Sequence, residues 1–207
     1  MVTEIKDSFA PKHYEDLKKS DLSDETILSA GIKAVRPADI NKKLGFNMPG
    51  LQSMYEIPYN ADYSRYRVFY EPGCELDSDG KPKPKYLCRK DSGNHLYVPP
   101  KARPFLCDPS IELYITEGEK KSLKAAQEGL CCIAISGLWN WSDGNKQLIS
   151  DFDQIALNGR TVYLVPDTDW LEPNRDGKKK NLQQAVYEFA YLLIEKGAVV
   201  SWIELPR

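Results

Sequence analysis

Residues 113–120, LYITEGEK, and residues 162–170, VYLVPDTDW, each join a short apolar run to a carboxylate. Both runs are rich in β-branched and aromatic residues, which is typical of buried strands. The first run ends at Glu117, and the second ends at Asp167 and Asp169. If the two strands pair in a parallel sheet, their carboxyl ends meet at one edge, where ligand sites of open α/β sheets collect. We therefore expect these three acids in one crevice.

Three carboxylates in one crevice repel one another unless a cation neutralises them. A hard divalent cation with oxygen ligands, Mg²⁺ above all, fits such a site. Asp167 and Asp169 point the same way if the chain stays extended, and Pro166, which donates no ladder hydrogen bond, marks the end of the strand. The structural alternatives are that Glu117 complements a helix dipole and that the aspartates belong to an ordinary turn.

Glu119 has a different expected role. Thr116 and Glu119 have the spacing of a capping box, in which Thr116 caps the next helix and Glu119 reaches back to the amide of the cap. We therefore predict a structural role for Glu119 and keep Glu117, Asp167 and Asp169 as the candidate site.

The bulk composition is that of an ordinary globular protein. The chain has 207 residues, of which 42% are apolar and 28% charged, and its net charge is −2. This charge gives no global attraction to nucleic acid, so any such affinity must come from a local patch. No apolar run is long enough for a membrane span, and residues 1–20 lack a signal-peptide core. The five cysteines show no C-x-x-C spacing, which argues against a zinc ribbon. An odd count of cysteines together with the lack of a secretion signal predicts reduced thiols in a cytoplasmic protein. Because no apolar run is long enough, we expect no membrane partner.

The second half of the chain alternates strands with helices, and we place a domain boundary near Pro109. Strands are expected at 112–116, 131–136, 161–166 and 198–205, and helices at 117–128, 146–152 and 182–195. Such alternation predicts right-handed crossovers and a mostly parallel four-stranded sheet with flanking helices over residues 110–207. Residues 1–109 predict a small α+β subdomain, with helices at 20–30 and 37–44 and strands at 65–70, 86–88 and 95–98.

Basic and aromatic residues suggest where a nucleic acid would bind. Between residues 81 and 103 the cations include Lys83, Lys85, Arg89 and Lys90, with Tyr86 interleaved, the pattern of single-strand binding. Further candidate phosphate contacts are Lys120 and Lys121 after Glu117, and Lys178 and Lys179 near Asp169. Trp139 and Trp141 are candidates for stacking on a base. The alternatives are solvated lysines and aromatic side chains that belong to the core.

These residues together resemble the Toprim domain, the metal-binding fold of bacterial-type primases, topoisomerases and some nucleases. Glu117-Gly118 matches the E-G motif after the family's first strand, Asp167-Thr168-Asp169 matches its D-x-D motif, and Gly137 matches the glycine that closes its second strand. The resemblance covers residues 110–207. ITEGEKKSLKAAQEG and SGLWNW look closest to the Toprim-like domain of plasmid and phage replication proteins, in which segments like DLSDETILSAGI, R-Y-R and KYL precede it.

The resemblance implies a Rossmann-like fold and Mg²⁺ or Mn²⁺, with Asp167 and Asp169 as metal ligands and Glu117 as general base or further ligand. It implies a primase-like nucleotidyltransferase of a plasmid, phage or other mobile element, which uses nucleotides and a single-stranded DNA or RNA template, with a helicase domain or subunit as a partner. The chain departs from the family in lacking a zinc module and in carrying the polar segment LEPNRDGKKK after Trp170. A Toprim nuclease and a non-catalytic nucleic-acid-binding accessory module remain the alternatives.

Overall fold

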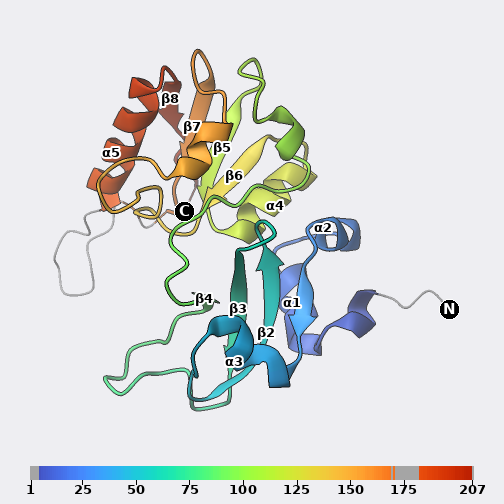
Figure 1. The fold of residues 1–207 in the computed structure, drawn as a ribbon. Helices are drawn as coiled ribbons and strands as arrows, with labels where there is room; N and C mark the ends of the chain where they lie inside the picture. The colour runs from blue at the N-terminus through green and yellow to red at the C-terminus, as the bar shows by residue number, and fades with distance from the viewer. Residues whose placement is uncertain (1–4, 169, 171–181, 207) are drawn as a thin grey trace. The chain divides into compact units, whose positions relative to one another are not determined.

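The computed structural model describes residues 5–168, 170 and 182–206, and its contacts divide the chain into two compact units, Met1–Ser92 and Gly93–Arg207 (Figure 1). The sequence analysis expected the boundary near Pro109. In the structure residues 93–109 belong to the second unit. All five cysteines are free thiols. No helix of the described residues has both the length and the apolar character that a membrane span requires.

The second unit contains the predicted parallel sheet. Its strands are β5 (Leu113–Glu117), β6 (Cys132–Ile135), β7 (Thr161–Val165) and β8 (Val199–Trp202). They lie in the order β6-β5-β7-β8, and every neighbouring pair is parallel. This confirms the α/β class with a four-stranded sheet. The central strands β5 and β7 pair directly, so the two apolar runs that end in carboxylates lie side by side.

Two helices cover this sheet, α4 (Glu119–Gln127) and α5 (Leu182–Glu195). The crossover β5-α4-β6 moves outward in one direction and β7-α5-β8 in the other, so right-handed connections place the two helices on opposite faces (Figure 1). The face under α5 holds the main core, in which Phe189 of α5 packs with Trp141 and with sheet residues such as Ile115 and Leu164. The 3-10 helices η3 (Arg103–Phe105) and η4 (Ser150–Gln154) complete the unit.

A buried arginine joins segments that lie far apart in the sequence. Arg160, just before β7, is 0% exposed. Its guanidinium donates to the carbonyl oxygens of Ile111 (2.8 Å), Leu106 (2.8 Å) and Phe105 (3.0 Å). A buried charge costs much free energy unless its hydrogen bonds are made. Arg160 therefore fastens the segment that leads into β5 to the start of β7.

The start of α4 corrects one sequence prediction. Thr116 does not cap the helix, because it is still part of β5 and its hydroxyl donates to the carbonyl oxygen of Val165 on β7 at 3.1 Å. The N-cap is Gly118, and no side chain caps the helix there. Glu119 is the first helical residue and is buried. The capping box was wrong because β5 pairs with β6 as far as Glu117 and keeps the backbone extended.

Other element boundaries also differ from expectation. Instead of a helix at 146–152, the described chain forms η4, which starts four residues later. Instead of a strand at 95–98, only Tyr97 forms an isolated bridge, to Ala134 of β6. Helix α5 occupies the predicted range, because its apolar residues repeat at helical spacing toward a single core.

The first unit is built on an antiparallel sheet in the order β1-β2-β3-β4. Its strands are β1 (Lys33–Val35), β2 (Leu51–Pro58), β3 (Ser64–Tyr70) and β4 (Tyr86–Cys88). Its helices are η1 (Ile5–Ser8), α1 (Pro11–Lys18), α2 (Asp24–Ser29), η2 (Pro37–Asp39) and α3 (Ile40–Leu44). Ser23 caps α2, with its hydroxyl accepting from the amide of Thr26 at 3.1 Å. The sequence did not predict α1, β1 or β2.

The two faces of this sheet differ in character. On one face, His13 of α1 stacks on Phe69 of β3, and the neighbouring strand β2 adds Tyr55. On the other face, Leu44 of α3 packs with Met54 and Val68. Because side chains alternate along a strand, Glu56 of β2 also lies on the α3 face, although it is charged.

Candidate metal centre and basic surface

Glu117 and Asp167 lie together at the carboxyl edge of the parallel sheet. Thr116 pairs in register with Val165, so β5 and β7 end side by side and each supplies one acid. The amide of Asp167 donates to Oε1 of Glu117 at 3.2 Å. The two carboxylate-bearing residues, 50 positions apart in the sequence, are thus brought into contact as the strand endings predicted.

Gly118 allows the chain to turn immediately after Glu117. Its φ of 86° and ψ of 141° lie in a region that residues with a Cβ rarely adopt. Its amide donates to the carbonyl oxygen of Ile135 on β6 at 2.9 Å, which anchors the turn to the sheet. The glycine of the E-G pair therefore lets α4 start within two residues of the strand and keeps Glu117 at the edge.

A lysine from α4 already neutralises part of this site. The ammonium of Lys121 forms an ion pair with Oδ1 of Asp167, and the two side chains are 50% and 40% exposed. Lys120 precedes it in the first turn of the helix and is half-buried. An exposed ion pair of this kind contributes little to stability, so the ammonium can be exchanged for another cation at small cost.

The donor set suits a hard divalent cation. Both carboxylates are half-buried and therefore remain open to a cation that keeps part of its water shell. In the part of the chain that the structure describes, no three Asp, Glu, His or Cys side chains gather closely enough to hold a metal. The third predicted ligand, Asp169, lies outside the described residues, as do Lys178 and Lys179.

The two predicted stacking tryptophans have different surroundings. Trp141 is fully buried and stacks on Phe189 of α5, with ring centroids 5.6 Å apart. It belongs to the core, which is the alternative that the sequence left open. Trp139 is 38% exposed and remains accessible to a ligand. Trp170, which directly follows Asp169, is buried in the same core.

The basic residues predicted between positions 81 and 103 divide between the two faces of the first unit's sheet. Tyr86 pairs with Arg67 across β3 and β4, and the guanidinium groups of Arg65 and Arg67 lie 5.1 Å and 5.5 Å from the centre of its ring. Lys85 is exposed beside this group. We call Arg65, Arg67, Lys85 and Tyr86 the basic–aromatic surface. Lys83 lies 5.2 Å from the ring centre of Tyr70 and donates to the carbonyl oxygen of Pro49.

Arg89 lies elsewhere, on the α3 face. It lines a pocket there with Lys42, Lys43 and Glu56. Sequence reasoning missed these partners because β2 was not predicted, and Glu56 had no motif to mark it. Lys90 is exposed, and its amide donates to the carbonyl oxygen of Leu44 at 3.1 Å.

Comparison with known proteins places this fold. No curated protein matches the sequence. A structure of the Aquifex aeolicus primase, comprising its zinc-binding and RNA polymerase domains, is similar with a TM-score of 0.60 and 16% identity over 95% of this chain and 50% of that one. The catalytic core of DnaG is similar with a TM-score of 0.56 and 18% identity over 94% of this chain and 64% of that one. The chain therefore has a primase-like fold and spans about half to two thirds of these structures.

A family model described as a domain of unknown function, DUF3854, matches residues 104–207. The match takes in the whole parallel sheet, both helices that cover it, and the edge at which Glu117 and Asp167 meet. Because it extends over half of the sequence, the chain belongs to the DUF3854 family.

Proposed function

We propose that this protein is a Toprim-type, metal-dependent nucleotidyltransferase that makes primers on a single-stranded template during replication of a plasmid, phage or other mobile element. The contact between Glu117 and Asp167 at the edge of a sheet with primase-like topology carries the proposal. Neither a metal site by itself nor a fold by itself specifies phosphodiester chemistry. The two together favour it over other uses of a carboxylate pair.

Glu117, Asp167 and Asp169 would hold Mg²⁺ or Mn²⁺. When bound, such an ion neutralises the charge that develops on phosphate oxygens during an in-line displacement. The reaction joins a primer hydroxyl to the α-phosphate of the incoming nucleotide and releases pyrophosphate. Glu117, whose carboxylate accepts from the amide of Asp167, would either take the proton of the attacking hydroxyl or complete the ligand set.

The lysines of α4 would serve the phosphates. Lys121 is held by Asp167, and once a divalent ion takes that carboxylate its ammonium is released within the first turn of α4. A lysine near a helix N-terminus, where the backbone amides also point outward, is well suited to bind a phosphate group. Lys120 lies beside it and would act in the same way.

The basic–aromatic surface would hold the template. Cations for phosphates and an aromatic face for bases are the groups that bind single strands without sequence preference. Arg65 and Arg67 lie 5.1 Å and 5.5 Å from the centre of the Tyr86 ring, and Arg67 is also paired with Asp16 at 3.1 Å. Arg65, Lys85 and the ring of Tyr86 would therefore make the first contacts with the strand. A helicase would be the natural partner of such an enzyme, since primers are needed where a duplex is opened.

The decisive experiment incubates the whole chain with single-stranded DNA, NTPs or dNTPs, and Mg²⁺ or Mn²⁺. We expect template-dependent oligomers, and a loss of at least about 100-fold in their rate for Asp167→Ala. Asp153→Ala is the matched control, because it removes an exposed aspartate of η4, which precedes the amino end of β7, whereas Asp167 follows the carboxyl end. Binding of Mn²⁺ followed by electron paramagnetic resonance should show the same loss for Asp167→Ala alone.

Three other outcomes would contradict the proposal. Cleavage of the template without synthesis would assign the site to a Toprim nuclease. Salt-sensitive binding of DNA without any turnover would indicate an accessory module. Equal Mn²⁺ affinity in the wild type and Asp167→Ala would mean that the carboxylates at this edge do not hold a metal.

A further inference from the structure

A pocket of about 500 Å³ opens on the α3 face of the first unit. Strands β2 and β3, the turn between them, helices η2 and α3 and the segment after β4 all contribute to its wall. This volume is that of a small-molecule site rather than of a single ion. We call it the Glu56 pocket, after the one carboxylate on its floor that is almost completely buried.

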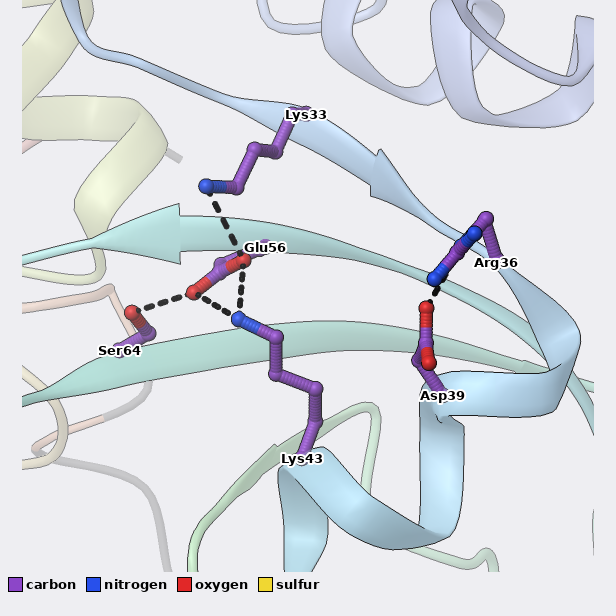
Figure 2. Close-up of polar contacts among 6 residues, drawn as sticks. All are labelled: Lys33, Arg36, Asp39, Lys43, Glu56 and Ser64. Atoms are coloured by element: carbon purple, nitrogen blue, oxygen red, sulfur yellow. Dashed lines mark hydrogen bonds and ion pairs between the residues drawn. The ribbon is translucent and has the colours of Figure 1, made fainter.

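Glu56 is 5% exposed and lies between two strands that each supply a neighbour (Figure 2). Lys33 of β1 faces it across the sheet, with its ammonium 3.6 Å from Oε2. Lys43 of α3 donates to both carboxylate oxygens, at 3.2 Å and 3.1 Å, and Ser64 of β3 donates to Oε1 at 2.8 Å. These neighbours hold the carboxylate of Glu56 in one position at the base of the pocket without the help of a ligand.

The cations of the pocket exceed its carboxylates. Arg36 is paired with Asp39 at 2.7 Å, and Lys43 is paired with Glu56. Lys42 and Arg89 line the same pocket, are exposed, and have no ion pair within the described residues. The remaining acid of the wall, Asp62, is exposed in the turn between β2 and β3. Counted with Lys33, five cations surround three carboxylates, so the pocket favours an anionic ligand.

The wall also carries groups for the uncharged part of a ligand. Tyr63 and Tyr66 line it with largely buried rings. The pKa of Tyr66 is raised to about 12 by burial and by the nearby charge of Glu56, so its hydroxyl keeps its proton. Burial acts to raise the pKa of Glu56, but the bonds from Ser64 and Lys43 and the charges of both lysines lower it overall. Glu56 is therefore ionised at neutral pH and repels a phosphate while accepting a hydroxyl.

We propose that the Glu56 pocket binds a nucleoside triphosphate, with its phosphates on Lys42 and Arg89 and a sugar hydroxyl on Glu56. One pocket of about 500 Å³ combines two exposed cations, a buried acceptor and the aromatic surface of Tyr63 and Tyr66, which are the groups that such a molecule requires. The inference concerns the first unit and needs no metal. It therefore goes beyond the carboxylate site at the edge of β5 and β7 and does not depend on it.

The test titrates ATP into the whole chain by calorimetry, at low salt and with EDTA so that no divalent ion contributes. We expect one ATP per chain, and at least about tenfold weaker binding by Lys42→Ala/Arg89→Ala, since charge-assisted hydrogen bonds to phosphate are among the stronger ones. Lys6→Ala/Lys19→Ala removes the same charge from exposed lysines of the first unit that do not line the pocket, and should bind ATP as the wild type does. Asp167→Ala should also bind normally, which separates this proposal from failure of the metal site.

Several results would overturn the inference. The first is that the wild-type chain binds no ATP, and the second is that the two double variants lose affinity for ATP equally. The third is that a single-stranded oligonucleotide displaces ATP, which would make the pocket part of the path of the template strand. Inorganic tripolyphosphate should bind at least about fivefold more weakly than ATP, because it has no sugar hydroxyl that could donate to Glu56. Equal affinity would reduce the pocket to an anion site. The circular dichroism spectrum of each variant must match that of the wild type. Lys42→Arg/Arg89→Lys keeps both positive charges and should bind ATP with an affinity close to that of the wild type.

Discussion

The two units of this protein place their charges differently. In the first unit, Glu56 lies in the middle of an antiparallel strand, where Lys33 and Lys43 neutralise its charge and Ser64 donates a hydrogen bond to it. In the second unit, Glu117 and Asp167 lie where parallel strands end, and the exposed side chain of Lys121 is paired with Asp167. In the first arrangement, residues of the same unit form hydrogen bonds and ion pairs with the carboxylate. The second leaves carboxylates available to an external cation.

Topology accounts for the difference. An antiparallel strand presents a mid-strand side chain to its neighbours on both sides, so Glu56 has cross-strand partners at fixed distance. Parallel strands end together at one edge, where side chains leave the sheet and meet solvent. The second unit also buries a charge away from this edge, Arg160, which is satisfied by backbone carbonyl oxygens.

The largest expected effect on stability is at Arg160. Arg160→Met should destabilise the second unit by about 3–4 kcal/mol, because it removes the three charge-assisted hydrogen bonds that fasten Phe105, Leu106 and Ile111 to the start of β7. All four tryptophans lie in this unit, so their fluorescence in a urea titration measures its unfolding alone. Arg103→Met, an exposed arginine of the same unit, should change the free energy of unfolding by less than about 0.5 kcal/mol. Equal midpoints for the two variants would refute the role given to Arg160.

A buried histidine should make the first unit sensitive to acid. Burial, together with the charge of Lys12, lowers the pKa of His13 from 6.5 to about 4. The unfolded chain takes up this proton at higher pH than the folded chain does. The contribution of His13 to the free energy of unfolding is therefore fully present above pH 6.5 and is lost as the pH falls toward 4. The loss should amount to roughly 2–3 kcal/mol.

The measurement for His13 is urea unfolding by far-ultraviolet circular dichroism at pH 7 and pH 4, with tryptophan fluorescence reporting the other unit separately. His13→Gln should be less stable at pH 7 but lose less on acidification than the wild type. His95→Gln, at the other histidine of the chain, should not alter the acid response of the first unit. An unchanged pH dependence in His13→Gln would contradict the assignment.

The smallest effect sharpens the comparison between carboxylates. Glu56→Gln should destabilise the first unit by about 1–2 kcal/mol at pH 7, since its lysine partners reach solvent and are not left buried. Because the folded pKa of Glu56 is lowered, its contribution exists above the ordinary pKa of 4.5 and disappears as the pH falls through the folded value. The difference between wild type and variant should therefore shrink at pH 3. Exposed Glu75 supplies the control, Glu75→Gln, and an effect of the same size there would remove the distinction.

The local sequence pattern was sufficient to predict an element where its apolar residues repeat at one regular spacing and face one core. Helix α5 was predicted to the residue, because its stripe of apolar side chains faces one sheet. The positions of β5 and β7 followed from apolar runs that end in acids. The meeting of Glu117 and Asp167 then followed from the parallel pairing that alternating strands and helices imply.

Other features depended on contacts that no local pattern records. Thr116 has the sequence context of a helix cap, but pairing of β5 on both sides keeps it in the strand. Trp139 and Trp141 are two residues apart and chemically identical, yet one is exposed and the other stacks on Phe189, because Phe189 comes from a helix far along the chain. Strand β2 went unpredicted, since its charged Glu56 breaks the expected apolar alternation.

The sequence by itself determined the α/β order of the second unit and the carboxylates at its edge, because strand and helix periods are local properties and parallel strands must end on one side. Only the tertiary structure decided how those charges are satisfied. It assigned Lys121 to Asp167, lysines to Glu56 and backbone oxygens to Arg160. Each of these pairings joins residues that are distant in sequence, and burial gives such a contact its energetic weight only once packing has brought the partners together.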